Sequence, residues 1–123
     1  MDAHFVRIVA TPEGGSRFLD DATPLSDGDF APPAPPLGLG PDSGAVATRF
    51  IGAPAGWDSP PHPAPARQWV VMVRGSVESV TSDGEARTFG PGAAVLVEDT
   101  TGTGHSTRVV GDEAWLAIVV VLA

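Results

Sequence analysis

The sequence lacks cysteine and lysine entirely. Without cysteine there can be no disulfide framework, no thiolate metal site and no cysteine nucleophile. Without lysine, catalysis through a Schiff base is excluded. Long apolar runs are missing too: the longest, 114–123, is too short to cross a bilayer as a helix, and the N-terminal MDAHFVRIVA does not resemble a signal peptide. We therefore expect a cytoplasmic protein that does not interact with membranes.

Positive charge is scarce. The chain has 7 basic residues, all arginine, against 15 acidic ones, which gives a net charge of -8. Proteins that bind nucleic acid draw much of their affinity from cationic contacts to phosphate, so nucleic acid is not an expected partner. We interpret the excess of negative charge as a contribution to solubility.

Helical signals are also nearly absent, because 15 glycines and 13 prolines interrupt the chain. Short β-branched runs between turn residues recur instead and predict strands, which together indicate one all-β domain, a sandwich or a barrel. The predicted strands are 4–10, 16–19, 46–51, 68–74, 76–81, 85–89, 94–97, 105–110 and 114–122.

Two proline-rich segments fall outside these strands. The first, 29–42, reads DFAPPAPPLGLGPD, and its prolines cannot lie in a central strand. We predict a mobile surface loop here, and a lid over a barrel mouth is the alternative. The second segment, 52–65, brings His62 to the start of the next strand.

The most specific pattern runs from His62 to His105. His62 is followed by Gln68 and Gly75, and the corner Gly90-Pro91-Gly92 precedes His105. This pattern resembles the two motifs of the cupin superfamily. The first motif has two histidines separated by one residue, then a glutamate and a glycine; the second has a Pro-Gly corner and a further histidine.

The resemblance covers 44–123 well and the N-terminal part loosely. It implies a double-stranded β-helix, that is, a jelly-roll or cupin barrel with a ligand cavity. In this interpretation the single domain 1–123 comprises N-terminal strands and a Pro-rich loop, 1–43, and the conserved barrel, 44–123. The family commonly dimerises through its sheets.

The sequence departs from the family's metal site at two positions. Ala64 replaces the second histidine, and Gln68 replaces the glutamate. Amide oxygen binds a divalent cation more weakly than carboxylate does, so either no cofactor is required or one divalent ion (Fe, Mn, Ni or Zn) binds with help from water, Glu98 or Asp99. The remaining metal ligands would be His62, Gln68 and His105.

Strand alternation predicts the lining of the cavity, because successive side chains point to opposite faces. If Gln68 faces inward, as the resemblance implies, Val70 and Met72 lie beside it, and Thr107 lies beside His105. Such an interior is largely apolar with a few polar groups, which suits a small organic substrate.

Three further roles follow from residue chemistry. His62 and His105 are candidate acid/base catalysts, since histidine titrates in the useful pH range. Asp99 would orient the ring of His105 and strengthen it as a base. Arg49 would bind a carboxylate or enolate if it faced inward, a direction that the sequence leaves open.

Three functions remain in contention. We favour an enzyme of bacterial metabolism, secondary metabolism included, whose histidines catalyse isomerisation, cyclisation or elimination of an oxygenated organic substrate. The alternatives are a metal-dependent cupin oxygenase or decarboxylase and a non-catalytic module that binds a small ligand.

The C-terminal run 115–122 is apolar on both faces of a strand. Burial of this strand on both sides, by the barrel and by a second element, would explain the pattern. The second element is either a partner chain, which would make the protein a homodimer, or the N-terminal strand of the same chain.

Overall fold

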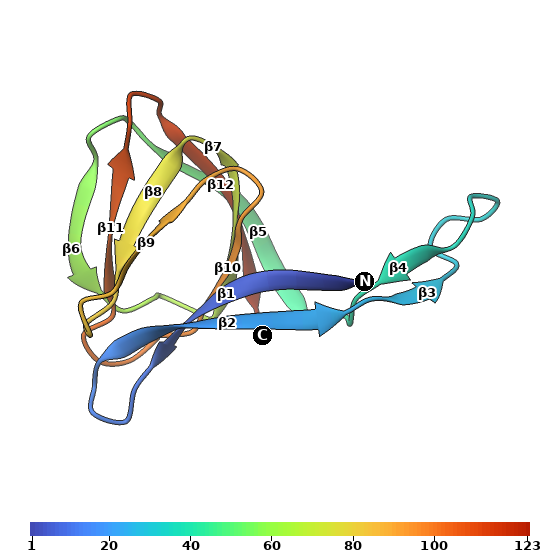
Figure 1. Cartoon of the computed structure of the whole chain (residues 1–123), viewed down its shortest axis with the longest axis horizontal. Coiled ribbons are helices and arrows are strands. Elements are labelled where there is room, and N and C mark those ends of the chain that lie inside the picture. The colour runs from blue at the N-terminus through green and yellow to red at the C-terminus, as the bar shows by residue number, and fades with distance from the viewer.

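The computed structural model describes residues 1–123 and consists of twelve β-strands without a helix, which confirms the all-β expectation (Figure 1). Accordingly, no helix could span a membrane. All nine predicted strands are present. The strands are β1 (Asp2–Ala10), β2 (Ser16–Pro24), β3 (Ser26–Gly28), β4 (Leu37–Leu39), β5 (Ala45–Ala53), β6 (Asp58–His62), β7 (Gln68–Arg74), β8 (Ser76–Val80), β9 (Ala86–Phe89), β10 (Ala94–Val97), β11 (His105–Val110) and β12 (Trp115–Leu122).

Two larger sheets face each other. One has six strands in the order β2-β1-β10-β7-β12-β5, and the other has four in the order β6-β11-β8-β9. The two sheets are not closed into one barrel. Their antiparallel pairs are nested: β5 pairs with β12, β6 with β11, β7 with β10, and β8 with β9. The segment from β5 to β12 is therefore one long hairpin whose successive pairs alternate between the two sheets.

The core lies between these sheets and follows from strand alternation. On β12, Trp115, Ala117 and Val119 are buried, whereas the residues between them are only partly covered. Val77 of β8 and Val109 of β11 meet this layer from the four-stranded sheet. Burial of each of the larger side chains stabilises the folded state by about 1.5–3 kcal/mol, and this burial holds the two sheets together.

The N-terminal strand does not cover β12. β1 pairs with β2 and, in parallel, with β10, so that β10 and β7 lie between β1 and β12 in the same sheet. The outer face of β7, β12 and β5 instead presents a row of paired residues, Val71, Ile118 and Phe50. Val71 and Phe50 are 37% and 68% exposed, so this face has no cover within the chain.

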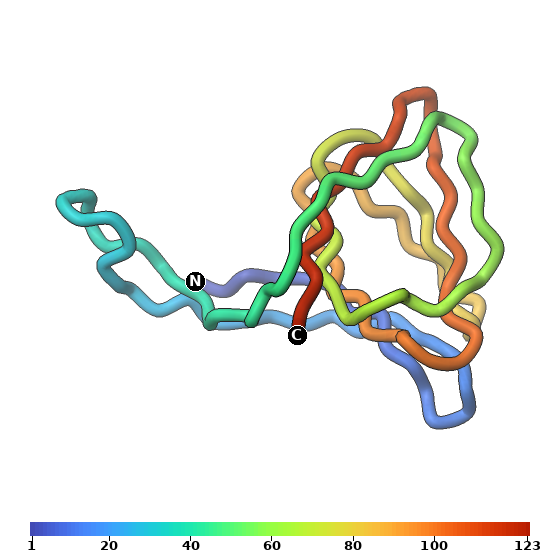
Figure 2. The backbone as a smooth tube through the Cα atoms, turned by 180° about the vertical axis from the view of Figure 1, so that it is seen from behind, coloured from blue at the N-terminus to red at the C-terminus, as the bar shows by residue number.

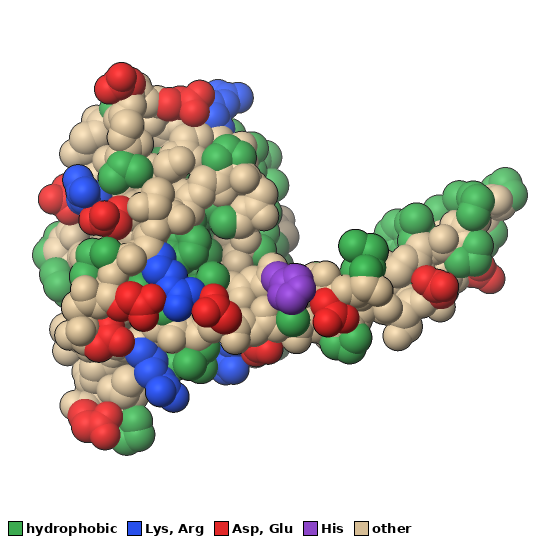
Figure 3. Space-filling view, viewed as in Figure 1, with side chains coloured by type: hydrophobic (Ala, Val, Ile, Leu, Met, Phe, Trp, Pro, Cys, Tyr) green, Lys and Arg blue, Asp and Glu red, His purple; other side chains and the backbone are tan.

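The Pro-rich segment 29–42 differs from its prediction. Its residues 37–39 pair with 26–28, and this two-stranded ribbon projects away from the sheets (Figures 1 and 2). Hydrophobic side chains gather along it (Figure 3), and among them Phe30 and Leu37 are exposed. It is therefore a projecting β-ribbon. None of its residues lines the cavity between the sheets, so it is not a lid.

The second proline-rich segment contains a strand that the sequence did not predict. β6 includes Pro60 and Pro61 and pairs only with β11, at the edge of the four-stranded sheet. An edge strand tolerates proline because one of its sides needs no N–H donors. This strand places His62 beside His105.

Candidate functional site

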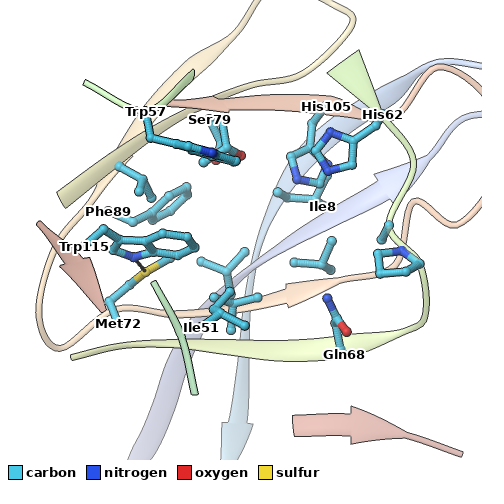
Figure 4. A pocket seen from close by; sticks show the side chains of 17 residues that line it. Ile8, Ile51, Trp57, His62, Gln68, Met72, Ser79, Phe89, His105 and Trp115 are labelled. Carbon is cyan, nitrogen blue, oxygen red and sulfur yellow. Dashed lines mark hydrogen bonds between the residues drawn. The ribbon is translucent and has the colours of Figure 1, made fainter. Parts of the chain in front are cut away.

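A cavity of about 170 Å³ lies between the two sheets, and 11 of its 17 lining residues are hydrophobic. Its two ends differ in chemistry (Figure 4). Trp57, Phe89 and Trp115 form an aromatic end, and His62 and His105 lie together at the other end. The volume suits a ligand about the size of a single ring, since a cavity of about 150 Å³ holds benzene.

The two histidines are cross-strand neighbours. His62 ends β6 and His105 begins β11, and the two residues are paired in the sheet. Their ring centroids are 5.6 Å apart, and their planes are tilted by 37°. His105 is buried whereas His62 is exposed, so one imidazole belongs to the interior and the other to the rim.

Asp99 fixes the ring of His105. The imidazole Nδ1–H donates to Oδ2 of Asp99 over 2.6 Å, and the carboxylate is fully buried. The second oxygen, Oδ1, has no hydrogen-bond partner. The backbone holds Asp99 in place, because its carbonyl accepts from the Ala64 N–H at 2.9 Å. This geometry leaves Nε2 of His105 as the nitrogen with a free lone pair.

His62 is held in the same tautomer. Its Nδ1 lies 3.1 Å from the carbonyl oxygen of Pro60, and a carbonyl can only accept, so Nδ1 carries the hydrogen. Both neutral histidines therefore keep an unprotonated Nε2. A pair of such rings can accept a proton at one nitrogen and, once protonated, return it from the other.

Gly104 allows the strands that carry the histidines to approach each other. Its φ is +74°, a conformation that favours glycine, and a Cβ at this position would overlap the backbone carbonyl of His62. The Ser16 hydroxyl donates to the Gly104 carbonyl over 2.7 Å in a buried hydrogen bond. The loop before β11 is thus held against β6 by close backbone packing and against β2 by this hydrogen bond.

Of the remaining predicted residues, four line the cavity and Arg49 does not. Gln68, Val70, Met72 and Thr107 all line the cavity, and Gln68 lies across it from the two histidines (Figure 4). Arg49 is exposed and lies outside the cavity, so it does not face a bound substrate there.

Glu98 lies outside the cavity as well. It accepts hydrogen bonds from Arg7 at 2.6 Å and Arg67 at 2.9 Å. Burial by itself would raise the pKa of the Glu98 carboxyl, but these hydrogen bonds and the two positive charges outweigh it, so its pKa lies below the usual value. Glu98 is thus a structural ion-pair partner.

The cavity offers few donor atoms for a metal ion. No group of three His, Cys, Asp or Glu side chains is arranged to hold an ion. Ala64 lines the cavity without a donor atom, Glu98 is bound to two arginines, and Asp99 is bound to His105. Two imidazoles and the Gln68 amide are the donors that remain.

Sequence reasoning missed Ser79. This residue is 5% exposed, lines the cavity from β8 and lies 3.1 Å, oxygen to oxygen, from the Thr107 hydroxyl. Alternation could have found it, since Ser79 shares a strand face with Val77. The aromatic lining by Trp57 and Phe89 was missed as well, because only the three-dimensional fold brings these residues to one end of the cavity.

No protein-family model matches the chain, and a search of curated proteins finds no relative of it in sequence.

Proposed function

We propose that the chain is a cupin-like jelly roll built from β5 to β12. The support is the nested pairing of these eight strands, distributed over two facing sheets in the orders β5-β12-β7-β10 and β6-β11-β8-β9. A jelly roll has eight strands in two sheets with this kind of winding. β1 and β2 then extend one sheet, and the cavity occupies the interior of the roll.

We propose further that the protein is an acid/base enzyme acting on a small oxygenated organic molecule. One observation carries this proposal: the buried Asp99–His105 pair lies beside His62 at the end of a mostly apolar cavity. Asp99 holds His105 in the tautomer that presents Nε2 and stabilises the imidazolium that forms when this nitrogen takes a proton.

The chemistry is a proton transfer. Nε2 of His105 takes a proton from a carbon next to an electron-withdrawing group, and the electron pair of the broken C–H bond moves into that group. Return of a proton to another carbon, from either histidine, gives isomerisation. Departure of a leaving group instead gives elimination. The apolar lining keeps competing water from the site and strengthens these electrostatic effects.

A test uses 5-nitrobenzisoxazole, whose acidic C–H is removed by a base while its N–O bond breaks to give a coloured phenolate. We expect saturable turnover that His105→Ala lowers by about 100-fold, the usual contribution of a positioned base. His4→Ala is the matched control, because His4 is exposed and outside the cavity. A rate no higher than that of free imidazole, or full activity in both His62→Ala and His105→Ala, would contradict the proposal.

A binding module without catalysis is the second candidate, and the apolar lining favours it. It predicts saturable binding of a small aromatic molecule without turnover of any carbon acid. A metal-dependent oxygenase or decarboxylase has less support, since two imidazoles and a neutral amide bind a divalent ion more weakly than a set that includes a carboxylate. Stoichiometric Fe, Mn, Ni or Zn in the purified protein, with activity lost on chelation, would favour the metal-dependent enzyme over the other two candidates.

A further inference from the structure

The Ser79–Thr107 hydroxyl pair has unused hydrogen-bonding capacity inside the cavity. The two residues are cross-strand partners on β8 and β11, and their oxygens are 3.1 Å apart. Each hydroxyl carries one hydrogen, and only one of the two hydrogens can lie between the oxygens. Neither hydroxyl makes any other hydrogen bond within the protein. One donor therefore remains free in a mostly apolar interior, where an unmade hydrogen bond is costly.

The hydroxyl pair lies between the aromatic end of the cavity and the histidines. Thr107 follows His105 by two residues on β11, a separation of about 7 Å along an extended strand. In Figure 4, Ser79 lies near Trp57 and Phe89 at the aromatic end. A molecule whose oxygen binds the hydroxyl pair thus has aromatic side chains on one side and the histidines on the other.

We propose that the Ser79–Thr107 pair is the oxygen-binding site of the cavity and that its ligands are small, planar carbonyl compounds attached to a single aromatic or conjugated ring. A free hydroxyl donor requires an acceptor, which a carbonyl oxygen supplies. The flat ring packs against Trp57, Phe89 and Trp115, since aromatic rings prefer offset or edge contacts with one another.

This assignment rests on the proposed acid/base function in one respect. With the carbonyl oxygen on the hydroxyl pair, the adjacent α-carbon lies on the side toward His105. The hydrogens of an α-carbon are the acidic ones, and a hydrogen bond to the oxygen stabilises the enolate that forms when one is removed. Ser79 and Thr107 would then determine which substrates are bound and position them.

The test compares acetophenone with α-methylstyrene, which has the same planar shape but carries a methylene group in place of the carbonyl oxygen. The readout is the indole N–H signals in ¹⁵N NMR spectra. Trp57 and Trp115 line the cavity and should shift, whereas Trp69 lies on the opposite face of β7 and serves as an internal reference. We expect acetophenone to bind about 10-fold more tightly than α-methylstyrene, the value of one net hydrogen bond.

The variant Ser79→Ala/Thr107→Val removes both hydroxyls with little change in shape. We expect it to weaken acetophenone binding about 10-fold and to leave α-methylstyrene binding unchanged. Its melting temperature should stay near that of the parent, because both partners of the hydrogen bond are replaced together. Each single variant keeps one donor and should lose less. Ser106→Ala is the matched control, since Ser106 neighbours Thr107 without lining the cavity.

Equal affinities for the two probes, or an equal loss of both in the double variant, would overturn the assignment. If the double variant does not fold, the ratio of the affinities of the parent protein for the two probes decides. The outcome is independent of turnover. Oxygen-dependent binding without turnover of 5-nitrobenzisoxazole would refute the acid/base function and support the oxygen-binding site. Turnover without oxygen-dependent binding would support the acid/base function and refute the oxygen-binding site.

Discussion

Asp99 is the residue on which the proposed chemistry most depends, because it is fully buried and binds the ring of His105, the proposed base, directly. Replacement by asparagine keeps the shape and an acceptor oxygen but removes the negative charge that stabilises the imidazolium. We expect Asp99→Asn to lower the rate with 5-nitrobenzisoxazole by about 100-fold or more while the fold is retained. The measurement is the rate together with the ¹⁵N shifts of the His105 ring, which report its tautomer.

A merely structural role for Asp99 would give a different result. The variant would then lose thermal stability, and the folded fraction would keep the parent rate and the parent His105 shifts. The Oδ1 atom has no partner, so an amide group placed there loses no existing hydrogen bond. We therefore expect the effect to appear in the rate more than in stability.

Glu98 makes the chain sensitive to acid. Its pKa is below the usual value in the folded state, so its contribution to stability is present above the ordinary glutamate pKa of about 4.3 and is lost as the pH falls through the lower folded value. We expect Glu98→Gln to reduce the free energy of unfolding by about 1 kcal/mol at pH 7, a modest value because Arg67 is largely solvated.

Urea denaturation over a pH series checks this expectation. The difference between the parent and Glu98→Gln should shrink as the pH falls below about 4 and vanish once Glu98 is protonated in the folded state as well. Glu85→Gln is a suitable comparison, since Glu85 pairs with Arg87 at the surface. A difference that persists unchanged at low pH would show that the ion pairs are not its source.

At the scale of elements, Gly104 controls how closely the start of β11 approaches β6. A side chain here meets the backbone carbonyl of His62, which cannot move without displacing that histidine. We expect Gly104→Ala to destabilise the protein by about 3 kcal/mol or more and to remove activity. Gly111→Ala is the matched control. Its φ is +81° with nothing nearby, so only the conformational cost of about 1 kcal/mol applies.

Chemical denaturation of both variants separates these two costs. Equal losses in Gly104→Ala and Gly111→Ala would mean that the close approach to His62 carries no energetic weight. Alternation along the strands groups several of the cavity residues correctly. Gln68, Val70 and Met72 follow each other on one face of β7, and Thr107 follows His105 on β11.

At the scale of the whole molecule, the outer face of β5, β12 and β7 is apolar and uncovered, whereas the protein carries a net charge of -8 elsewhere. Exposed apolar patches of this kind are typical of interfaces, and a flat sheet face can pack against an identical copy about a two-fold axis. We expect a homodimer joined at Val71, Ile118 and Phe50. Light scattering coupled to gel filtration measures its mass.

Two phenylalanines provide the control for this dimer. Phe50→Asp should give a monomer, because Phe50 lies in the sheet-face row. Phe30→Asp should leave the dimer intact, because Phe30 lies on the projecting β-ribbon. A parent protein that is monomeric up to about 0.1 mM, or dissociation by Phe30→Asp alone, would contradict this interface.

The sequence predicted the all-β class, nine of the strands and the placement of Gln68, Val70 and Met72 on one face of β7. These features are local: glycine and proline break helices, and alternation needs only neighbouring residues. It did not predict β6, because two prolines obscure an edge strand, or the ribbon of β3 and β4, whose pairing spans a proline-rich turn.

The composition of the site depends on how distant segments pack. His62, Asp99 and His105 belong to three segments, and strand pairing between β6 and β11 together with the loop after β10 brings them into contact. The same packing leaves Arg49 and Glu98 outside the cavity and brings Ser79 to Thr107. Side-chain contacts between distant segments depend on sheet order and register, and these are set by burial of the whole core rather than by any local pattern.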